Sequence, residues 1–97
     1  MLNPDIHNTA RRFIVSREPK HQRQIVSKIL SLCQDPKPPD SQPLKGTRLN
    51  ERRATIGEYR IIYRVESSDD PTNDGTLHVD AVGKRNDDEV YRRFGKH

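Results

Sequence analysis

The feature that most constrains the fold is an alternating segment in the middle of the chain. After a tight turn, residues 59–66 alternate tyrosine, isoleucine and valine with Arg60 and Arg64. A period of two places successive side chains on opposite faces of a strand. We therefore expect a strand with one face in the core, carrying Tyr59 and Tyr63, and one face that carries both arginines.

The composition limits how such a strand can be covered. The chain has 97 residues, of which 30% are hydrophobic. This length fits one domain, residues 1–97, and the low apolar content predicts a thin core. A thin core favours a sheet that is covered on one face and leaves the other face available to a ligand.

The N-terminal third predicts two helices. Asn3 followed by Pro4 is typical of a helix start, with an N-cap acceptor and proline in the first turn. Pro19 interrupts the pattern, and a second apolar stripe ends at Asp35-Pro36. Two adjacent helices with a short joint indicate a helical hairpin. The apolar face of the first helix would consist of Ile6, Ala10, Phe13 and Ile14.

The remainder of the chain predicts a small sheet. A Pro-rich connector over residues 37–42 precludes regular structure, and an acidic loop over residues 68–75 joins the last two strands. Asn86 begins a capping pattern for a short C-terminal helix that closes at Gly95. The fold class is therefore α+β, with the helical hairpin packed on an antiparallel sheet of three or four strands. The three strands expected from the pattern are Arg52–Ile56, Tyr59–Ser67 and Thr76–Val82.

Charge is distributed unevenly along the chain. There are 18 Lys+Arg and 14 Asp+Glu, a net charge of +4. The basic residues gather over residues 45–64 and again at 84–85, which indicates a polyanion partner, although a solvated charged face explains the charge alone equally well. The candidate nucleic-acid contacts are Lys45, Arg48, Arg52, Arg53, Arg60, Arg64, Lys84 and Arg85.

Cysteine and histidine give little indication of other chemistry. The single Cys33 excludes an internal disulfide and is expected in the core. No Cys/His cluster has the spacing of metal ligands, so we expect no metal and no cofactor. His78 is expected to be structural, on the same strand face as Asp80 and Val82. No apolar run is long enough for a signal peptide or a membrane span, so a cytoplasmic protein without membrane contact is expected.

Three blocks of sequence resemble a known family. Leu44-Lys45-Gly46, the segment Gly57–Tyr63, and Val82-Gly83-Lys84-Arg85 followed by Glu89-Val90-Tyr91 are similar to the RelE/ParE superfamily of toxins from bacterial type II toxin–antitoxin modules. The likeness is nearest to the RelE-like branch in the last block. It covers about residues 4–94 in the order of elements.

The resemblance implies an mRNA interferase, an endoribonuclease that cleaves translated mRNA in the ribosomal A site. The RNA 2′-hydroxyl attacks the neighbouring phosphorus without a metal, and a cognate antitoxin neutralises the toxin. By the same resemblance, Arg60 holds the phosphate, Arg85 lies near the leaving 5′-oxygen, and Tyr91 stacks on or orients the nucleotide. Arg53 matches a basic residue that helps to activate the 2′-hydroxyl.

The chain departs from the family pattern at two places. Thr55 stands where the family has a further basic residue, and no strand is expected before the first helix. Two alternatives therefore stay open: a ParE-like toxin that inhibits DNA gyrase, and a catalytically weak RNA-binding relative.

Overall fold

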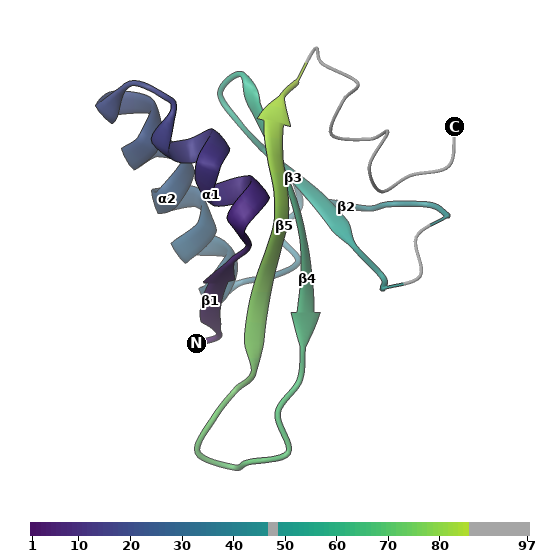
Figure 1. The fold of residues 1–97 in the computed structure, drawn as a ribbon. Helices are drawn as coiled ribbons and strands as arrows, with labels where there is room; N and C mark the ends of the chain where they lie inside the picture. The colour runs from purple at the N-terminus through teal and green to yellow at the C-terminus, as the bar shows by residue number, and fades with distance from the viewer. Residues whose placement is uncertain (47–48, 86–97) are drawn as a thin grey trace.

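The computed structural model describes residues 1–46 and 49–85. Two helices pack on one face of a five-stranded sheet, and the sheet order is β1-β5-β4-β3-β2 (Figure 1). Strand β1 is parallel to β5, and the other neighbours are antiparallel. The elements are β1 (Asn3–Ile6), α1 (Asn8–Val15), α2 (Pro19–Gln34), β2 (Gln42–Pro43), β3 (Arg52–Ile56), β4 (Tyr59–Glu66) and β5 (Thr76–Lys84).

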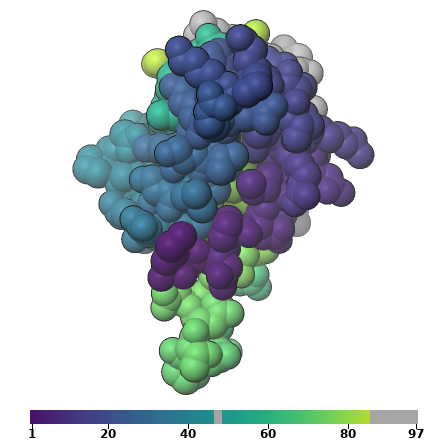
Figure 2. Space-filling view, turned by 90° about the vertical axis from the view of Figure 1, so that its left-hand side faces the viewer, coloured from purple at the N-terminus to yellow at the C-terminus, as the bar shows by residue number. Residues whose placement is uncertain are grey.

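The core lies between the helices and one face of the sheet. Helix α2 inserts Ile25, Ile29 and Leu32, all at most 1% exposed. Burial of such a side chain contributes roughly 1.5–3 kcal/mol. The side of the molecule seen in Figure 2 is therefore covered by α1 and α2, while the loop between β4 and β5 projects beyond them. The sheet residues that complete this core are Ala54, Tyr59, Ile61, Tyr63, Leu77, Val79 and Val82.

Several sequence predictions are confirmed. Strands β3, β4 and β5 lie where they were expected, although β4 ends at Glu66 and β5 continues to Lys84. Tyr59 and Tyr63 are 1% and 0% exposed, and Cys33 is buried. Gly57 has a φ of 56°, which a residue with a side chain rarely adopts, and it forms the tight turn before β4.

The prediction that Asn3-Pro4 begins the first helix is wrong. These residues belong to β1, since the Asn3 N–H donates to the Gly75 carbonyl at 2.9 Å and the His7 N–H to that of Val79 at 3.0 Å. Pro4 is compatible with β1 because this strand lies at the sheet edge, where a missing N–H costs little. Helix α1 begins only at Asn8, with the extended residue His7 as its N-cap.

The strand count also differs from the prediction. The sheet has five strands and is mixed, whereas three or four antiparallel strands were expected. The additional members are β1 and the two-residue β2, which falls at the end of the segment predicted to be irregular. The predicted C-terminal helix lies outside the described residues.

A β-bulge changes the direction of side chains on β5. Ile62 pairs with Ala81 and Tyr63 pairs with Val79, so Asp80 is an additional residue in β5. Beyond a bulge the alternation is reset. Val82 consequently packs in the helix-facing core, contrary to the prediction that it shares a face with His78 and Asp80.

The β4–β5 loop closes at Gly75, which has a φ of 117°. A Cβ at this position would collide with the Glu66 carbonyl oxygen and approach Ser67 Cα. We expect Gly75→Ala to destabilise the protein by about 1–3 kcal/mol, because it combines backbone strain with a main-chain clash. The change in the free energy of unfolding is measured by chemical denaturation, with circular dichroism as the signal. Asp69→Ala in the same loop is the control, with an expected change within about 0.5 kcal/mol, and equal stability of the two variants would contradict the prediction.

Candidate nucleic-acid interface

The face of the sheet that points away from the helices carries the arginines. Residues paired across neighbouring strands share a face, and Thr55 pairs with Arg60 while Arg53 pairs with Ile62. Ala54 and Ile61, which lie between them, are buried against the helices. Arg53, Thr55, Arg60 and Ile62 therefore lie on the face that α1 and α2 do not cover, which we call the open face.

Arg60 and Arg85 lie at the same end of the paired strands β4 and β5. Arg60 pairs with Gly83 on β5, which has no side chain to cover the guanidinium group from that side. Arg85 continues the ladder beyond β5, since its N–H donates to the Glu58 carbonyl at 2.7 Å. Arg85 lies in the turn that directly follows β5, so this bond places its backbone at the end of the strand pair that carries Arg60. The two arginines to which the family resemblance gives the phosphate and the leaving oxygen thus lie at the same end of β4 and β5.

Arg53 lies diagonally across from Arg60. Its partner Ile62 is two residues along β4 from Arg60, and such diagonal neighbours are separated by roughly 7–8 Å. The Arg53 Nη2 donates to Gln42 Oε1 on β2 at 2.6 Å, which holds the guanidinium group toward the sheet edge. Thr55, between Arg53 and the tight turn, contributes a neutral side chain where the family pattern has a cation.

Arg64 shares the open face but is engaged by a carboxylate. Its Nε lies 3.2 Å from Asp80 Oδ2, and the Asp80 side chain is only 6% exposed. His7 Nδ1 lies 3.1 Å from the other carboxylate oxygen of Asp80. Arg64 therefore compensates a buried negative charge, which reduces its availability to a phosphate.

Three further basic residues lie away from this group. Arg52 pairs with the core residue Tyr63, on the helix side of the sheet, and its Nη2 donates to Ser41 Oγ at 2.8 Å. Lys84 pairs with Tyr59 and is exposed, and Lys45 is exposed next to Gly46 in the segment that follows β2. Arg48 and Tyr91 lie outside the described residues.

The end of β4 next to Arg60 is fixed by Tyr59. Its hydroxyl lies 2.6 Å from His21 Nδ1 on α2, and its ring makes an edge contact with Phe13. Burial, followed by the nearby Glu58 carboxylate, raises the pKa of the Tyr59 hydroxyl. The phenol therefore stays protonated at neutral pH and acts as a positioning group beneath the turn, with no basic role.

Sequence reasoning missed the contribution of Asp80 and His7. Asp80 depends on the bulge in β5, and His7 follows a strand that the sequence pattern did not indicate. The open face also has a small apolar centre that the sequence pattern did not single out, formed by Ile62 and Ala81 with Leu44 packed against them. The only sequence pattern that indicates this apolar centre is the position of Ile62 between Arg60 and Arg64 on β4.

The fold of residues 1–46 and 49–85, two helices on one face of a five-stranded sheet, is that of the small toxins of the RelE/ParE superfamily. The chain belongs to the family described as ParE toxin of type II toxin–antitoxin system, parDE, which matches residues 8–89. No helix among the described residues is long and apolar enough to cross a membrane.

Solved structures of toxin–antitoxin complexes share the fold. The RelBE2 complex from Mycobacterium tuberculosis matches with a TM-score of 0.68 and 24% identity, over 87% of this chain and 98% of that one. The archaeal RelE–RelB complex from Pyrococcus horikoshii OT3 matches with a TM-score of 0.70 and 26% identity, over 88% of this chain and 96% of that one. No curated protein matches the sequence.

The Arg64–Asp80 pair gives a test of which arginines are structural. We expect Arg64→Ala to destabilise the protein by about 1–3 kcal/mol, because it leaves the buried Asp80 carboxylate with His7 alone. Denaturant unfolding measures the change. The exposed Arg23 on α2 provides the matched control: Arg23→Ala should change stability by less than about 0.5 kcal/mol. An Arg64→Ala protein as stable as the control would exclude the structural role.

Proposed function

We propose that this toxin is an mRNA interferase, which cleaves translated mRNA through attack of the RNA 2′-hydroxyl on the adjacent phosphorus. The observation that carries the proposal is the placement of Arg60 and Arg85 at one end of the paired strands β4 and β5. An endoribonuclease of this type needs fixed positive charge on both sides of the phosphate, and the two guanidinium groups supply it.

The chemistry follows from charge. Attack by the 2′-oxygen forms a pentacoordinate phosphorane, and its equatorial oxygens carry more negative charge than the starting diester. A preorganised donor near such an oxygen typically increases the rate by about 10²–10³. Arginine suits this role because its planar fork donates two parallel hydrogen bonds to phosphoryl oxygens. The reaction breaks the P–O5′ bond and leaves a cyclic phosphate and a 5′-hydroxyl.

The proposed catalytic residues are better suited to stabilising charge than to transferring protons. Arginine has a pKa above about 12 and is a poor proton shuttle. Within the described residues, His21 is bonded to Tyr59, and His7 and His78 lie at the β1 edge of the sheet. We therefore assign electrostatic roles to Arg60 and Arg85, a supporting role to Arg53, and nucleotide stacking to Tyr91.

Cleavage is proposed to depend on the ribosome. Thr55 leaves the cationic set one member short, so the in-line geometry of the 2′-oxygen and the leaving oxygen has to come partly from outside the toxin. An mRNA held in the decoding site of a translating ribosome supplies that geometry. The remaining basic residues, Lys45, Arg48, Arg52 and Lys84, then contribute to nonspecific attraction of nucleic acid.

The family match favours a second candidate, inhibition of DNA gyrase, because the matched family is named for ParE toxins. The two candidates differ in a direct measurement. Primer extension on cellular mRNA after brief induction shows new 5′ ends for an interferase, whereas a supercoiling assay with purified gyrase shows inhibition for a gyrase poison. Gyrase inhibition without mRNA cleavage would overturn the proposal. A catalytically weak RNA-binding relative would give neither result.

Substitution of the two arginines tests the site. We expect Arg60→Ala and Arg85→Ala each to reduce mRNA cleavage by at least about 10²-fold and to relieve growth arrest, since each removes one charged donor. Cleavage is measured by primer extension, and folding by circular dichroism. Arg12→Ala, on the exposed side of α1, is the matched control and should leave toxicity unchanged. Full toxicity of the Arg60→Ala, Arg85→Ala double variant would refute this assignment.

The antitoxin is proposed to bind the exposed side of α2. A groove there is lined by Gln22, Arg23, Val26, Ser27 and Leu30, and Val26 and Leu30 are 37% and 43% exposed. Both similar solved structures are complexes of a toxin with its antitoxin, and an antitoxin helix with apolar anchors fits such a groove.

Charge introduced into this groove gives a separate test of the partner. We expect Val26→Asp and Leu30→Asp each to weaken antitoxin binding by at least about tenfold, because each places a carboxylate in an apolar contact. Binding is measured by calorimetry with the purified antitoxin. Toxicity without antitoxin should persist, and Thr9→Asp on α1 should bind normally. Unchanged affinity of both groove variants would place the antitoxin elsewhere.

A further inference from the structure

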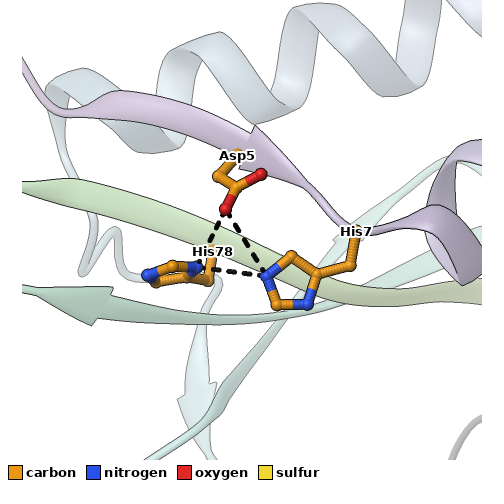
Figure 3. Close-up of side chains that lie close together, drawn as sticks. All are labelled: Asp5, His7 and His78. Carbon is orange, nitrogen blue, oxygen red and sulfur yellow. Dashed lines mark hydrogen bonds and ion pairs between the residues drawn. The ribbon is translucent and has the colours of Figure 1, made fainter.

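A cluster of three metal-ligating side chains lies at the β1 edge of the sheet. Parallel pairing of β1 with β5 places Asp5 beside His78, and His7 follows the end of β1. Figure 3 shows the three side chains directed toward one point between the strands. His7 and His78 are 71 positions apart in the chain, so no local spacing in the sequence indicates the cluster.

The distances between the three donor atoms fit a tetrahedral metal ion. His7 Nε2 and His78 Nδ1 are 3.1 Å apart, and Asp5 Oδ2 lies 3.4 Å from His78 Nδ1 and 3.7 Å from His7 Nε2. With zinc–ligand bonds of about 2.0–2.1 Å, the edges of a tetrahedral site measure about 3.4 Å. The observed values bracket that edge. An octahedral face at the same bond length would have shorter edges, of about 2.9 Å.

The outer nitrogens of both histidines are held by carboxylates. His7 Nδ1 lies 3.1 Å from the buried Asp80 Oδ1, and His78 Nε2 lies 2.8 Å from Glu66 Oε1. In the tautomer in which each of these nitrogens donates its N–H to the carboxylate, the inner nitrogen of a neutral ring keeps a lone pair. Carboxylate partners of this kind are the usual outer support of metal-binding histidines.

In that tautomer three lone pairs converge on one point, from two nitrogens and one carboxylate oxygen. Such an arrangement is repulsive unless a cation lies between the atoms. A proton would join only one pair of them, whereas a metal ion would coordinate all three. We propose that Asp5, His7 and His78 form a binding site for a divalent transition-metal ion of the zinc class, with a water molecule as fourth ligand.

The proposed site is accessible to an ion from solvent, and a bound ion would connect β1 with β5. Asp5 and His7 are 55% and 36% exposed, so an ion enters from solvent, while His78 is 13% exposed and anchors the site. A bound ion joins edge strand β1 to the central strand β5, and through the His7–Asp80 contact it supports the ion pair of Asp80 with Arg64. This role is independent of the proposed RNA cleavage.

The test uses the full-length chain, freed of metal with a chelator and titrated with Zn²⁺ alone. We expect one equivalent to bind, with a rise in the thermal midpoint. Glu66→Gln should weaken binding by about 10–100-fold, and Asp5→Asn and His78→Gln by at least as much. His21→Gln, which removes a histidine outside the cluster, should bind like wild type. Asp5 is the decisive position because it is exposed and its substitution leaves the core intact.

Cobalt provides an independent reading of the geometry. Co²⁺ in the wild-type site should show the intense visible bands of tetrahedral coordination, and these should be lost in Asp5→Asn and His78→Gln. Absence of stoichiometric Zn²⁺ binding to wild type would overturn the proposal. Binding that Asp5→Asn and His78→Gln leave unchanged would also overturn it, since the ion would then be bound elsewhere.

Discussion

The structure depends on the hydrogen bonding of β5 on both of its edges. On one side β5 pairs in parallel with β1, and on the other it pairs antiparallel with β4. Its inward residues Leu77 and Val79 are fully buried under the helices. A slip of one residue in either pairing would exchange the two faces of the strand. The core and the open face are therefore specified by the same register.

Asp80 connects Arg64 on β4 with His7 at the end of β1. The bulge turns this buried carboxylate toward Arg64 on one side and His7 on the other. A buried charge is tolerated where several donors satisfy it, and removal of one donor leaves the others insufficient. The open face thus combines two kinds of arginine: Arg64 belongs to the internal ion pair, whereas Arg60 and Arg85 lie at the far end of the strand pair.

The predictability of each element from sequence follows from the range of the interactions that form it. The alternation of residues 59–66 and the glycine turn before it are local, so β4, its turn and its buried tyrosines were predicted correctly. Strand β1 has four residues and a proline, and its hydrogen bonds go to residues near 75–79. Its local signal, Asn3-Pro4, favours a helix start, and tertiary pairing overrides it. The short β2 is likewise specified only by its partner β3.

The residues of the candidate site likewise separate into those that local sequence patterns predict and those that depend on long-range contacts. Strand periodicity predicted that Arg60 and Arg64 share one face, whereas Arg53 and Arg85 entered the site only through the family resemblance. Periodicity did not separate Arg64 from the others, because its ion pair requires the bulge at Asp80. Arg52 was grouped with its neighbours by charge, although alternation puts it on the helix side. The Asp5, His7 and His78 cluster requires the pairing of distant strands and has no local pattern.

The parallel pairing of β1 with β5 also sets the order in which the chain can fold. Helices α1 and α2 and the β3–β4 hairpin consist of neighbours in sequence, so their contacts close much shorter loops than the pairing of β1 with β5. Strand β1 has no partner until β5 has emerged, since Asn3 pairs with Thr76 and Ile6 with Val79. Closure of such a long loop comes late and is slow compared with local contacts. We therefore expect the pairing of β1 with β5 to be the late step in folding of this domain.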